Sequence, residues 1–429
     1  MILQQYKGAD DLSKICERPS LNTKKVSSAV KTILTKIKAE GDQAVRAYSA
    51  KFDNVDIAEF VIGENELRAA EEEISPELKK AIDKAAKNIS AFHKTQIQQP
   101  IKLETMPGIS CEQRAVPIER VGLYVPGGTA PLFSSVLMLA IPAVLAGCRK
   151  IVLTTPPDKT GSVPAAIRYA AYRSGLKTVY RVGGAQAIAA MAYGTETIPG
   201  VDKILGPGNQ FVTAAKQLLA ADGMAIDMPA GPSEVAIVAD ENANPQYVAA
   251  DLLSQAEHGI DSQVLLVCTD DQLIGQITKA VEQQLSVLPR QKMAKKVMEQ
   301  SLALKVKNLE EAMTISNAYA PEHLILNVKN PRNLATKVVN AGSVFLGNLT
   351  PESLGDYASG TNHTLPTNMA ARAYSGVNMD AFMKKITFQQ LTPEGIQSIG
   401  KEVVTMAREE QLMAHANAMQ FRIENFQNQ

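Results

Sequence analysis

Residues 121–154 read VGLYVPGGTAPLFSSVLMLAIPAVLAGCRKIVLT and carry the clearest structural pattern in the chain. A short apolar run at 121–125 is ended by Pro126-Gly127-Gly128, a combination typical of a turn. An apolar segment at about 134–146 is long enough for a helix, and a second short apolar run occupies 150–154. This order of strand, glycine turn, helix and strand predicts a parallel βαβ unit.

The same alternation continues along the chain. Apolar runs at 178–182 and 201–205 are each followed by a glycine turn, Gly183-Gly184 and Gly206-Pro207-Gly208. Such turns place backbone N–H groups and the positive end of a helix at the carboxyl edge of a sheet, where anions bind. The alternation resumes after residue 234 and runs to about 346. Two such blocks predict an α/β fold with two parallel sheets.

The two ends of the chain have a different pattern. Residues 1–100 carry apolar side chains at three- and four-residue spacing, which predicts helices. The tail after about residue 378 is also predicted to be helical, but it is polar and has few apolar residues of its own. We therefore expect the tail to pack on another surface, such as that of a second subunit.

Composition restricts the classes of function. The chain has 429 residues, and its 44 Lys and Arg balance its 44 Asp and Glu, so no nucleic-acid partner is expected. The longest apolar run, Val136–Ala146, contains Pro142 and is too short to span a membrane. The N-terminus becomes charged at once, unlike a signal peptide, and the four cysteines lie far apart without a CxxC motif. These features predict a cytoplasmic protein without a membrane partner.

Four short segments contain residues that could carry chemistry. Each has a histidine near a carboxylate or an amide: Gln255 with His258, Glu322 with His323, Asp356 with His363, and Glu410 with His415. The first pair is three residues apart at the end of a predicted helix and shares a face. The last pair lies about 140° apart around an ideal helix and does not. Taken singly, every segment except the third is more simply explained by solvated helix residues or a loop ion pair.

Together, these segments offer an amide oxygen, several imidazoles and a carboxylate. That set suits Zn²⁺ or a similar borderline ion better than Ca²⁺ or Mg²⁺, and the remaining Glu and His would be free for proton transfer. The chain has no GxGxxG motif, so spacing alone does not predict a nicotinamide cofactor. The glycine turns nevertheless permit a dinucleotide.

Several longer motifs resemble the histidinol dehydrogenase family. They occur in order across roughly residues 30–418, and they read VGLYVPGGTAPLFSSVLMLAIPA, RVGGAQAIAAMAYGT, LGPGNQFV, DMPAGPSE, SQAEHG, APEHL, GDYASGTNHTLPT and EEQLMAHANA. The resemblance implies an enzyme of the last two steps of histidine biosynthesis, which oxidises L-histidinol to L-histidine through L-histidinaldehyde. It also implies two NAD⁺ and one water per turnover, and a homodimer with one Zn²⁺ in each subunit.

The resemblance also implies a domain organisation. Residues 1–20 would form a short helical N-terminal segment. Residues 21–123 and 235–377 would form a first incomplete Rossmann-like domain with the zinc and catalytic residues, and residues 124–234 an inserted second one with the NAD contacts. The tail, 378–429, would cross to the partner subunit.

Roles for individual residues follow from the same resemblance. Glu322 and His323 would be the acid–base pair: His323 takes the alcohol proton, and Glu322 activates the water that adds to the aldehyde. The implied zinc ligands are Gln255, His258 and Asp356, with His415 donated by the other subunit. The implied substrate contacts are these four ligands together with Ser233, His323, His363 and Glu410, of which Glu410 also comes from the partner. The implied NAD contacts are Tyr124, Gln186 and Asn209.

Three alternatives stand beside this interpretation. A thiol-dependent second step would use Cys111 or Cys148 to form a thiohemiacetal. A zinc hydrolase would use Glu322 to activate water and would need no nicotinamide. A third possibility is a metal-binding oligomer that has kept the fold of an enzyme but lost its catalytic activity.

Overall fold

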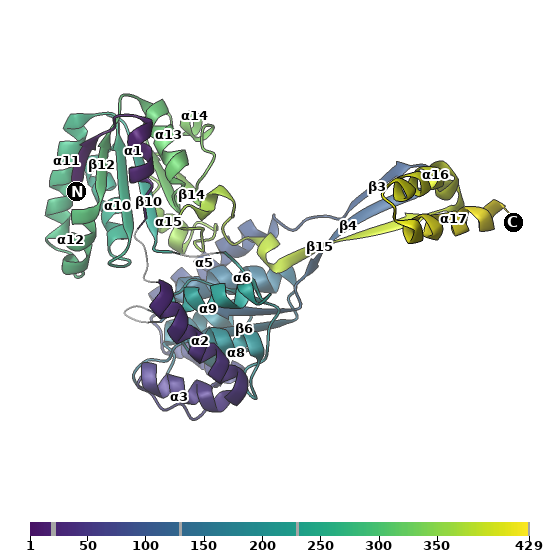
Figure 1. The fold of residues 1–429 in the computed structure, drawn as a ribbon. Helices are drawn as coiled ribbons and strands as arrows, with labels where there is room; N and C mark the ends of the chain where they lie inside the picture. Colours follow the sequence, from purple (N-terminus) through teal and green to yellow (C-terminus); the bar gives the residue numbers. More distant parts are fainter. Residues whose placement is uncertain (19–22, 128–130, 229–230, 428–429) are drawn as a thin grey trace. The chain divides into compact units, whose positions relative to one another are not determined.

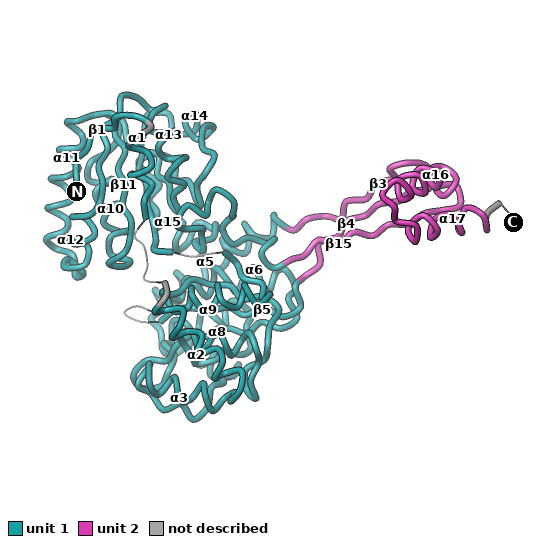
Figure 2. Tube along the Cα trace, viewed as in Figure 1, with its two compact units in different colours: residues 1–96, 118–382 teal, residues 97–117, 383–429 magenta. Residues whose placement is uncertain are grey.

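The computed structural model describes residues 1–18, 23–127, 131–228 and 231–427. The chain divides into two compact units, residues 1–96 with 118–382 and residues 97–117 with 383–429, and each is described by itself (Figure 2). The first unit contains two six-stranded sheets with their helices, and the second contains a three-stranded sheet with two helices.

The first sheet is parallel throughout and has the strand order β1-β12-β11-β10-β13-β14 (Figure 1). Its strands are β1 Ile2–Gln5, β10 Glu234–Ala239, β11 Gln263–Cys268, β12 Leu302–Lys305, β13 His323–Asn327 and β14 Ser343–Leu346. The associated helices are α1 Ala9–Ile15, α10 Pro245–Ala256, α11 Asp271–Leu285, α12 Gln291–Gln300, α13 Leu309–Tyr319, α14 Pro331–Ala335 and α15 Glu352–Tyr357.

Helices cover both faces of this sheet. Val235 and Ile237 of β10 belong to one apolar layer with α10, α11 and α12, while Ala236 and Val238 belong to the opposite layer with α1 and α13. Every residue of β10 and β13 is buried. This burial on both sides explains why these strands read as continuous apolar runs rather than as alternating ones.

The second sheet has the order β2-β7-β6-β5-β8-β9, and all pairs are parallel except β2 with β7. Its strands are β2 Val61–Gly63, β5 Arg120–Tyr124, β6 Lys150–Thr155, β7 Thr178–Arg181, β8 Lys203–Leu205 and β9 Ala225–Ile226. The helices around it are α2 Thr23–Glu40, α3 Asp42–Phe52, α4 Glu64–Ala69, α5 Pro76–Lys94, α6 Phe133–Ala146, α7 Ala165–Arg173, α8 Gly184–Tyr193 and α9 Gln210–Ala221. Short 3₁₀ helices complete the unit at η1 Ala70–Glu72, η2 Ala370–Arg372 and η3 Met379–Phe382.

The second unit is built on an antiparallel sheet. It comprises β3 Ile101–Met106, β4 Ile109–Pro117 and β15 Met383–Leu391, in the order β15-β4-β3, followed by α16 Pro393–Glu409 and α17 Met413–Gln427. The two helices pack on each other through a small apolar cluster that includes Val404, Ala407 and Ala416. Larger apolar side chains on the strands, such as Ile101 and Leu103, are exposed. The unit therefore has little core of its own.

The predicted α/β class with parallel sheets is confirmed, and the strand pairings show which predicted segments share a sheet. Strands β2 and β5 pair with β7, β6 and β8, so residues 61–63 and 120–124 belong to the sheet of 124–234 rather than to that of 235–377. The N-terminal segment contributes β1 to the edge of the first sheet, and the tail contains, after η3, a strand paired to β4. These pairings join residues far apart in sequence, which local periodicity does not reveal.

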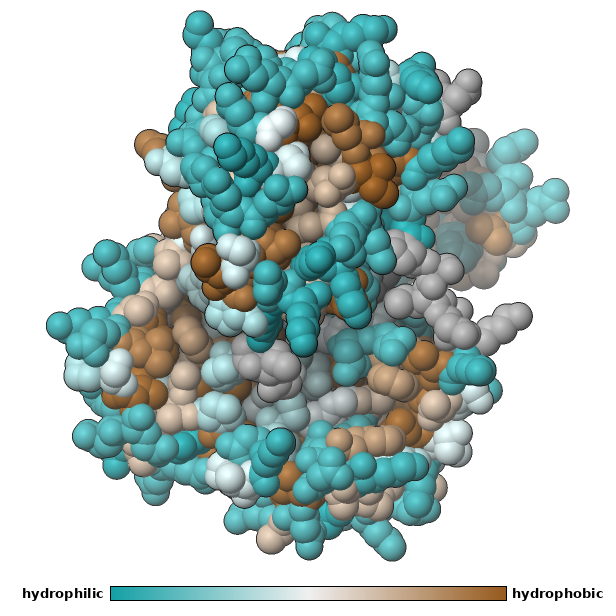
Figure 3. All heavy atoms as spheres, turned by 90° about the vertical axis from the view of Figure 1, so that its left-hand side faces the viewer, coloured by the Kyte–Doolittle hydropathy of each residue, from teal (hydrophilic) through white to brown (hydrophobic). Residues whose placement is uncertain are grey.

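Hydrophilic side chains predominate on the face that Figure 3 shows, with hydrophobic ones in separate small groups. None of the helices in the described ranges combines the length and apolar character that a membrane crossing requires.

Candidate active site

His323 is the first residue of β13, at the amino end of two central strands of the first sheet. It pairs in register with Val235 of the neighbouring β10, and its side chain is buried. The Nδ1 atom lies 3.2 Å from the backbone oxygen of Glu234. Because a carbonyl only accepts, Nδ1 carries the hydrogen, and Nε2 has no hydrogen-bond partner among the described residues. The nearest recorded group to Nε2 is Asp356 Oδ1, 3.5 Å away.

Three carboxylates surround this imidazole. Glu322 Oε2 and Glu352 Oε1 lie 3.6 and 3.8 Å from Nδ1, and Asp356 Oδ1 lies 3.5 Å from Nε2. Burial alone would lower the pKa of His323, but the negative charges of Glu352, Glu322 and Asp356 raise it. Burial in turn raises the pKa values of Glu322 and Glu352. Such mutually perturbed acids and bases are typical of sites that transfer protons.

The peptide group of Glu234 holds the acid–base pair in place. Its N–H donates to Glu322 Oε2 over 2.9 Å, and its carbonyl accepts from His323. The Glu234 side chain is neutralised by Arg18, whose Nε lies 2.6 Å from Oε1, and it also accepts from the backbone N–H of Asn368. A buried ion pair thus fixes the backbone on which both predicted catalytic side chains depend.

The helix α15 supplies Glu352 and Asp356, which are four residues apart and share a face. His363, in the following loop, donates from Nδ1 to the backbone oxygen of Asp356 over 2.8 Å. Its Nε2 lies 3.1 Å from Ser135 Oγ on α6. Both ring nitrogens of His363 are therefore used, and desolvation lowers its pKa, which keeps the ring neutral.

The end of α10 completes the cluster. Gln255 is fully buried, and neither atom of its amide has a hydrogen-bond partner in the described part of the chain. His258 follows just after the helix and is exposed. His258, Glu352 and Asp356 each offer one ligand atom, and these three atoms all lie within 4.8 Å of one another. This trio can hold a divalent cation.

Two of the four predicted metal ligands therefore lie together, namely His258 and Asp356. A third, Gln255, lies on α10, which packs on α15. Ser233 directly precedes β10, beside Glu234. Glu410 and His415 belong to the second unit, where α16 ends at Glu409 and α17 begins at Met413. Glu352 was not singled out from the sequence, and its only signal was its four-residue spacing from Asp356.

The predicted NAD contacts lie at the carboxyl edge of the second sheet, at the ends of β5, β7 and β8. Tyr124 Oη accepts from the N–H of Gly184, Gln186 Nε2 lies 3.4 Å from Asp53 Oδ2, and Asn209 caps α9. The first two of these side chains are buried. The turn at Gly206 has φ +124°, and a Cβ there would lie 2.1 Å from the Tyr124 carbonyl oxygen, so only glycine fits. Gly128, in the predicted turn after β5, lies outside the described residues.

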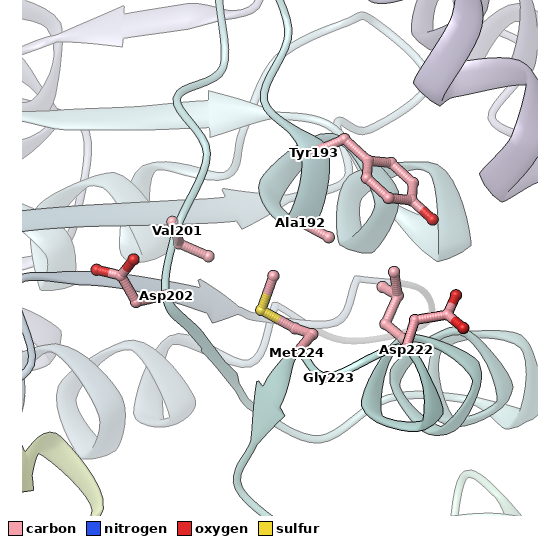
Figure 4. Close-up of a pocket in the computed structure, with 8 residues that line it drawn as sticks. Ala192, Tyr193, Val201, Asp202, Asp222, Gly223 and Met224 are labelled. Atoms are coloured by element: carbon pink, nitrogen blue, oxygen red, sulfur yellow. The ribbon is translucent and has the colours of Figure 1, made fainter.

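A pocket of about 350 Å³ lies at the opposite edge of the second sheet (Figure 4). Ala192, Val201 and Met224 face one another in it, and Asp202 and Asp222 lie at its rim. It contains none of the predicted site residues. Asp202 is paired with Arg120, but the carboxyl ends of α8 and α9 and the acid Asp222 disfavour the phosphates of a dinucleotide there.

The cysteines do not favour a thiol-dependent step. Burial raises the pKa of Cys148 to about 11, so its thiol is protonated at neutral pH and is a poor nucleophile. Cys111 lies in β4 of the second unit. No described contact links either sulfur to His323.

The fold and the cluster define a class: a two-sheet α/β protein with a buried acid–base centre beside a potential metal site. Residues 16–423 match the family model described as histidinol dehydrogenase. The histidinol dehydrogenase of Bacteroides thetaiotaomicron is 54% identical over 423 residues, covering 99% of both chains, and that of Vibrio cholerae is 50% identical over 416 residues, covering 96% of both. A crystal structure of histidinol dehydrogenase from Elizabethkingia anophelis matches with a TM-score of 0.97 and 49% identity, covering 100% of this chain and 99% of that one. The chain belongs to the histidinol dehydrogenase family, and the predicted resemblance is confirmed.

Proposed function

We propose that this protein oxidises L-histidinol to L-histidine through L-histidinaldehyde, the last two steps of histidine biosynthesis. One turnover consumes two NAD⁺ and one water. The observation that carries the proposal is the buried pair of Glu322 and His323 among further carboxylates, in a chain that matches histidinol dehydrogenases over almost its whole length. A cytoplasmic location, without nucleic-acid or membrane partners, fits this role.

The donor set fits one Zn²⁺ per subunit. We assign Gln255, His258 and Asp356 as ligands from one subunit and His415 as the ligand from its partner. The unpaired buried amide of Gln255 and the proximity of His258 to Asp356 support this assignment. When bound, Zn²⁺ supplies a Lewis acid for the nitrogen donors of histidinol, and NAD⁺ accepts the hydride.

His323 acts first in the proposed sequence. Its Nε2 takes the hydroxyl proton while the carbinol carbon loses a hydride, which leaves the aldehyde. The nearby carboxylates stabilise the imidazolium that forms. The hydrogen bond from Nδ1 to the Glu234 carbonyl keeps the ring in the required orientation.

Glu322 acts in the second oxidation. Its carboxylate takes a proton from water, and the hydroxide oxygen adds to the aldehyde carbon. The imidazolium of His323 returns its proton to the carbonyl oxygen, so that a neutral hydrate forms and the imidazole is again a base. His323 then accepts a hydroxyl proton from the hydrate while the carbon loses the second hydride, which leaves the carboxylic acid. The raised pKa of Glu322 makes its carboxylate a better base than an exposed one.

The remaining assignments concern substrate, cofactor and partner. Histidinol contacts the zinc ligands and His323, and also Ser233, His363 and the partner's Glu410. The NAD site contains Tyr124, Gln186 and Asn209. The helix starts and glycine turns at the carboxyl edge of the second sheet favour dinucleotide phosphates there. Exposed apolar side chains in the second unit support a homodimer in which this unit packs on the partner.

The direct test is stoichiometry. The purified, zinc-loaded protein is mixed with L-histidinol and NAD⁺, and NADH and histidine are measured in the same tube. We expect two NADH per histidine. Absence of NADH from a zinc-bound dimer would reject the proposal and would favour the hydrolase alternative.

Glu322→Gln separates the two steps. We expect this variant to slow oxidation of histidinaldehyde by about 10²-fold or more, and to slow oxidation of histidinol much less, because only the second step needs an activated water. Single-turnover measurements started from the alcohol and from the aldehyde give the two rates. Equal losses in both would contradict the role of Glu322 as the water activator.

A further inference from the structure

The turn after β8 is held by a buried ion pair that the proposed chemistry does not use. Lys216 lies on α9 and Asp227 follows β9, and their side chains are 4% and 2% exposed. The Nζ atom of Lys216 forms an ion pair with Oδ1 of Asp227. A buried ion pair seldom adds much to stability, because both charges lose their hydration. The groups that this pair contacts therefore indicate what it does.

Both members of the pair bind the backbone of one residue, Gly206. Asp227 Oδ2 accepts from the N–H of Gly206 over 2.7 Å, and Lys216 Nζ donates to its carbonyl oxygen over 2.9 Å. Hydrogen bonds with a charged partner are shorter and stronger than neutral ones. Lys203 is also close enough to interact with the charge of Asp227, but its Nζ donates to the Ala381 carbonyl. Lys216 is thus the cation that fixes Gly206.

The conformation of Gly206 decides where the following turn lies. Its φ of +124° is one that other residues rarely adopt, and the turn approaches Tyr124 so closely that a Cβ would meet the carbonyl oxygen of that residue. Three residues later, Asn209 caps α9 by accepting from the N–H groups of Phe211 and Val212. A rotation at Gly206 would therefore move both the cap and the start of the helix.

We propose that Lys216 and Asp227 are positioning residues for the dinucleotide, because they fix the turn at 206–209 at the start of α9. This inference rests on the proposed NAD site, which includes Asn209, and adds two residues to it. Neither side chain contacts the cofactor itself, since both are buried and are already paired with each other and with the turn. The pair is neutral as a whole, so the positive end of α9 stays available to phosphate.

The test measures NADH binding to the zinc-loaded protein, from the fluorescence of NADH and without histidinol. We expect Lys216→Met to raise the Kd of NADH by about 10-fold, the change that corresponds to loss of one hydrogen bond to a charged group. The KM for NAD⁺ should rise with it. The kcat at saturating NAD⁺ and the KM for histidinol should change less than about three-fold, because the acid–base pair belongs to the first sheet. An unchanged Kd of NADH in a folded variant would overturn the proposal.

A double variant separates positioning of the turn from balance of charge. Lys216→Met alone leaves the carboxylate of Asp227 buried without its cation, which should lower the midpoint of thermal unfolding. Adding Asp227→Asn removes that charge and should return the midpoint toward the parent value. NADH binding should nevertheless stay weak, because the Gly206 carbonyl still lacks its donor. If binding recovers together with stability, the pair serves charge balance alone and the proposal is wrong.

Arg168→Met is the matched control. Arg168 is a largely buried cation on α7, beside the same sheet, and it is paired with Glu73 and donates to the Val163 carbonyl. Its loss should lower the unfolding midpoint without changing the Kd of NADH. If Arg168→Met weakens NADH binding as much as Lys216→Met does, the effect is one of general stability and the proposal fails. Should Lys216→Met not fold, the double variant is measured instead, and a parental Kd there would overturn the proposal.

NADH binding by the parent protein distinguishes failure of this inference from failure of the proposed function. If the parent protein binds NADH and Lys216→Met binds it equally well, the cofactor site stands and only the role of the ion pair is rejected. If the parent protein binds no NADH, the proposed NAD dependence is itself rejected, and the positioning role is rejected with it.

Discussion

Replacing His323 by asparagine is expected to lower kcat for both oxidations by about 10²- to 10⁴-fold, the range that a positioned general base contributes. Asparagine can still donate a hydrogen bond to the Glu234 carbonyl, so the local backbone should keep its geometry. It has no basic atom at the position of Nε2, the ring nitrogen that faces Asp356. Separate rates from histidinol and histidinaldehyde should fall together, unlike those of Glu322→Gln.

The control for this variant is the other buried histidine of the first unit. The Nδ1 atom of His93 lies 2.9 Å from the Ile89 carbonyl oxygen within α5, and burial lowers its pKa. His93→Asn should reduce the free energy of unfolding and leave kcat within a few-fold of its original value. Zn²⁺ content should be normal in both variants, since neither histidine is assigned as a ligand. A His323→Asn protein that retains more than about a tenth of kcat would contradict the proposed base.

The central strands could be predicted from the sequence because burial on both faces makes them continuous apolar runs. Strands β5, β6, β7 and β8 were expected close to their observed positions. Strands β1 and β3 were not, since most of their residues are exposed and carry mixed polar and apolar side chains. Their pairing with distant strands decides their conformation, and a single sequence does not report it.

The candidate site likewise has residues that could be predicted from the sequence and residues that could not. Glu322 and His323 are adjacent in sequence, so their chemistry could be recognised locally. The ion pair that holds them in place could not be recognised from the sequence, because Arg18 and Glu234 are 216 residues apart. Glu352 was missed because α15 has only six residues, too few to show a helical pattern of apolar side chains.

The geometry calculated for Glu410 and His415 assumed an ideal helix, which the chain does not form between them. Their separation was calculated for one continuous helix, but the chain leaves α16 after Glu409 and has a left-handed residue at Gln411, φ +60°, before α17 begins. The 140° relation therefore does not apply to them. The two side chains are carried by a helix end and by the following helix.

Mixing two inactive variants tests that partner site. His415→Asn and Gln255→Ala should each lose Zn²⁺ and nearly all activity, because each removes one assigned ligand from every site of its own homodimer. In a mixed dimer, one site is intact. It takes Gln255, His258 and Asp356 from the His415→Asn subunit and His415 from the Gln255→Ala subunit. The other site carries both changes.

Random exchange of equal amounts makes about half of the dimers mixed, so about a quarter of all sites should be intact under two-fold symmetry. We expect Zn²⁺ content and NADH formation to rise together from near zero toward that fraction after subunit exchange, verified by native mass spectrometry. Mixing His415→Asn with Glu410→Ala is the control. Both changes then lie in the donated segment, so no mixed dimer has an intact site and activity should not return. Mixed dimers of the first pair that remain inactive would show that His415 serves its own subunit or none.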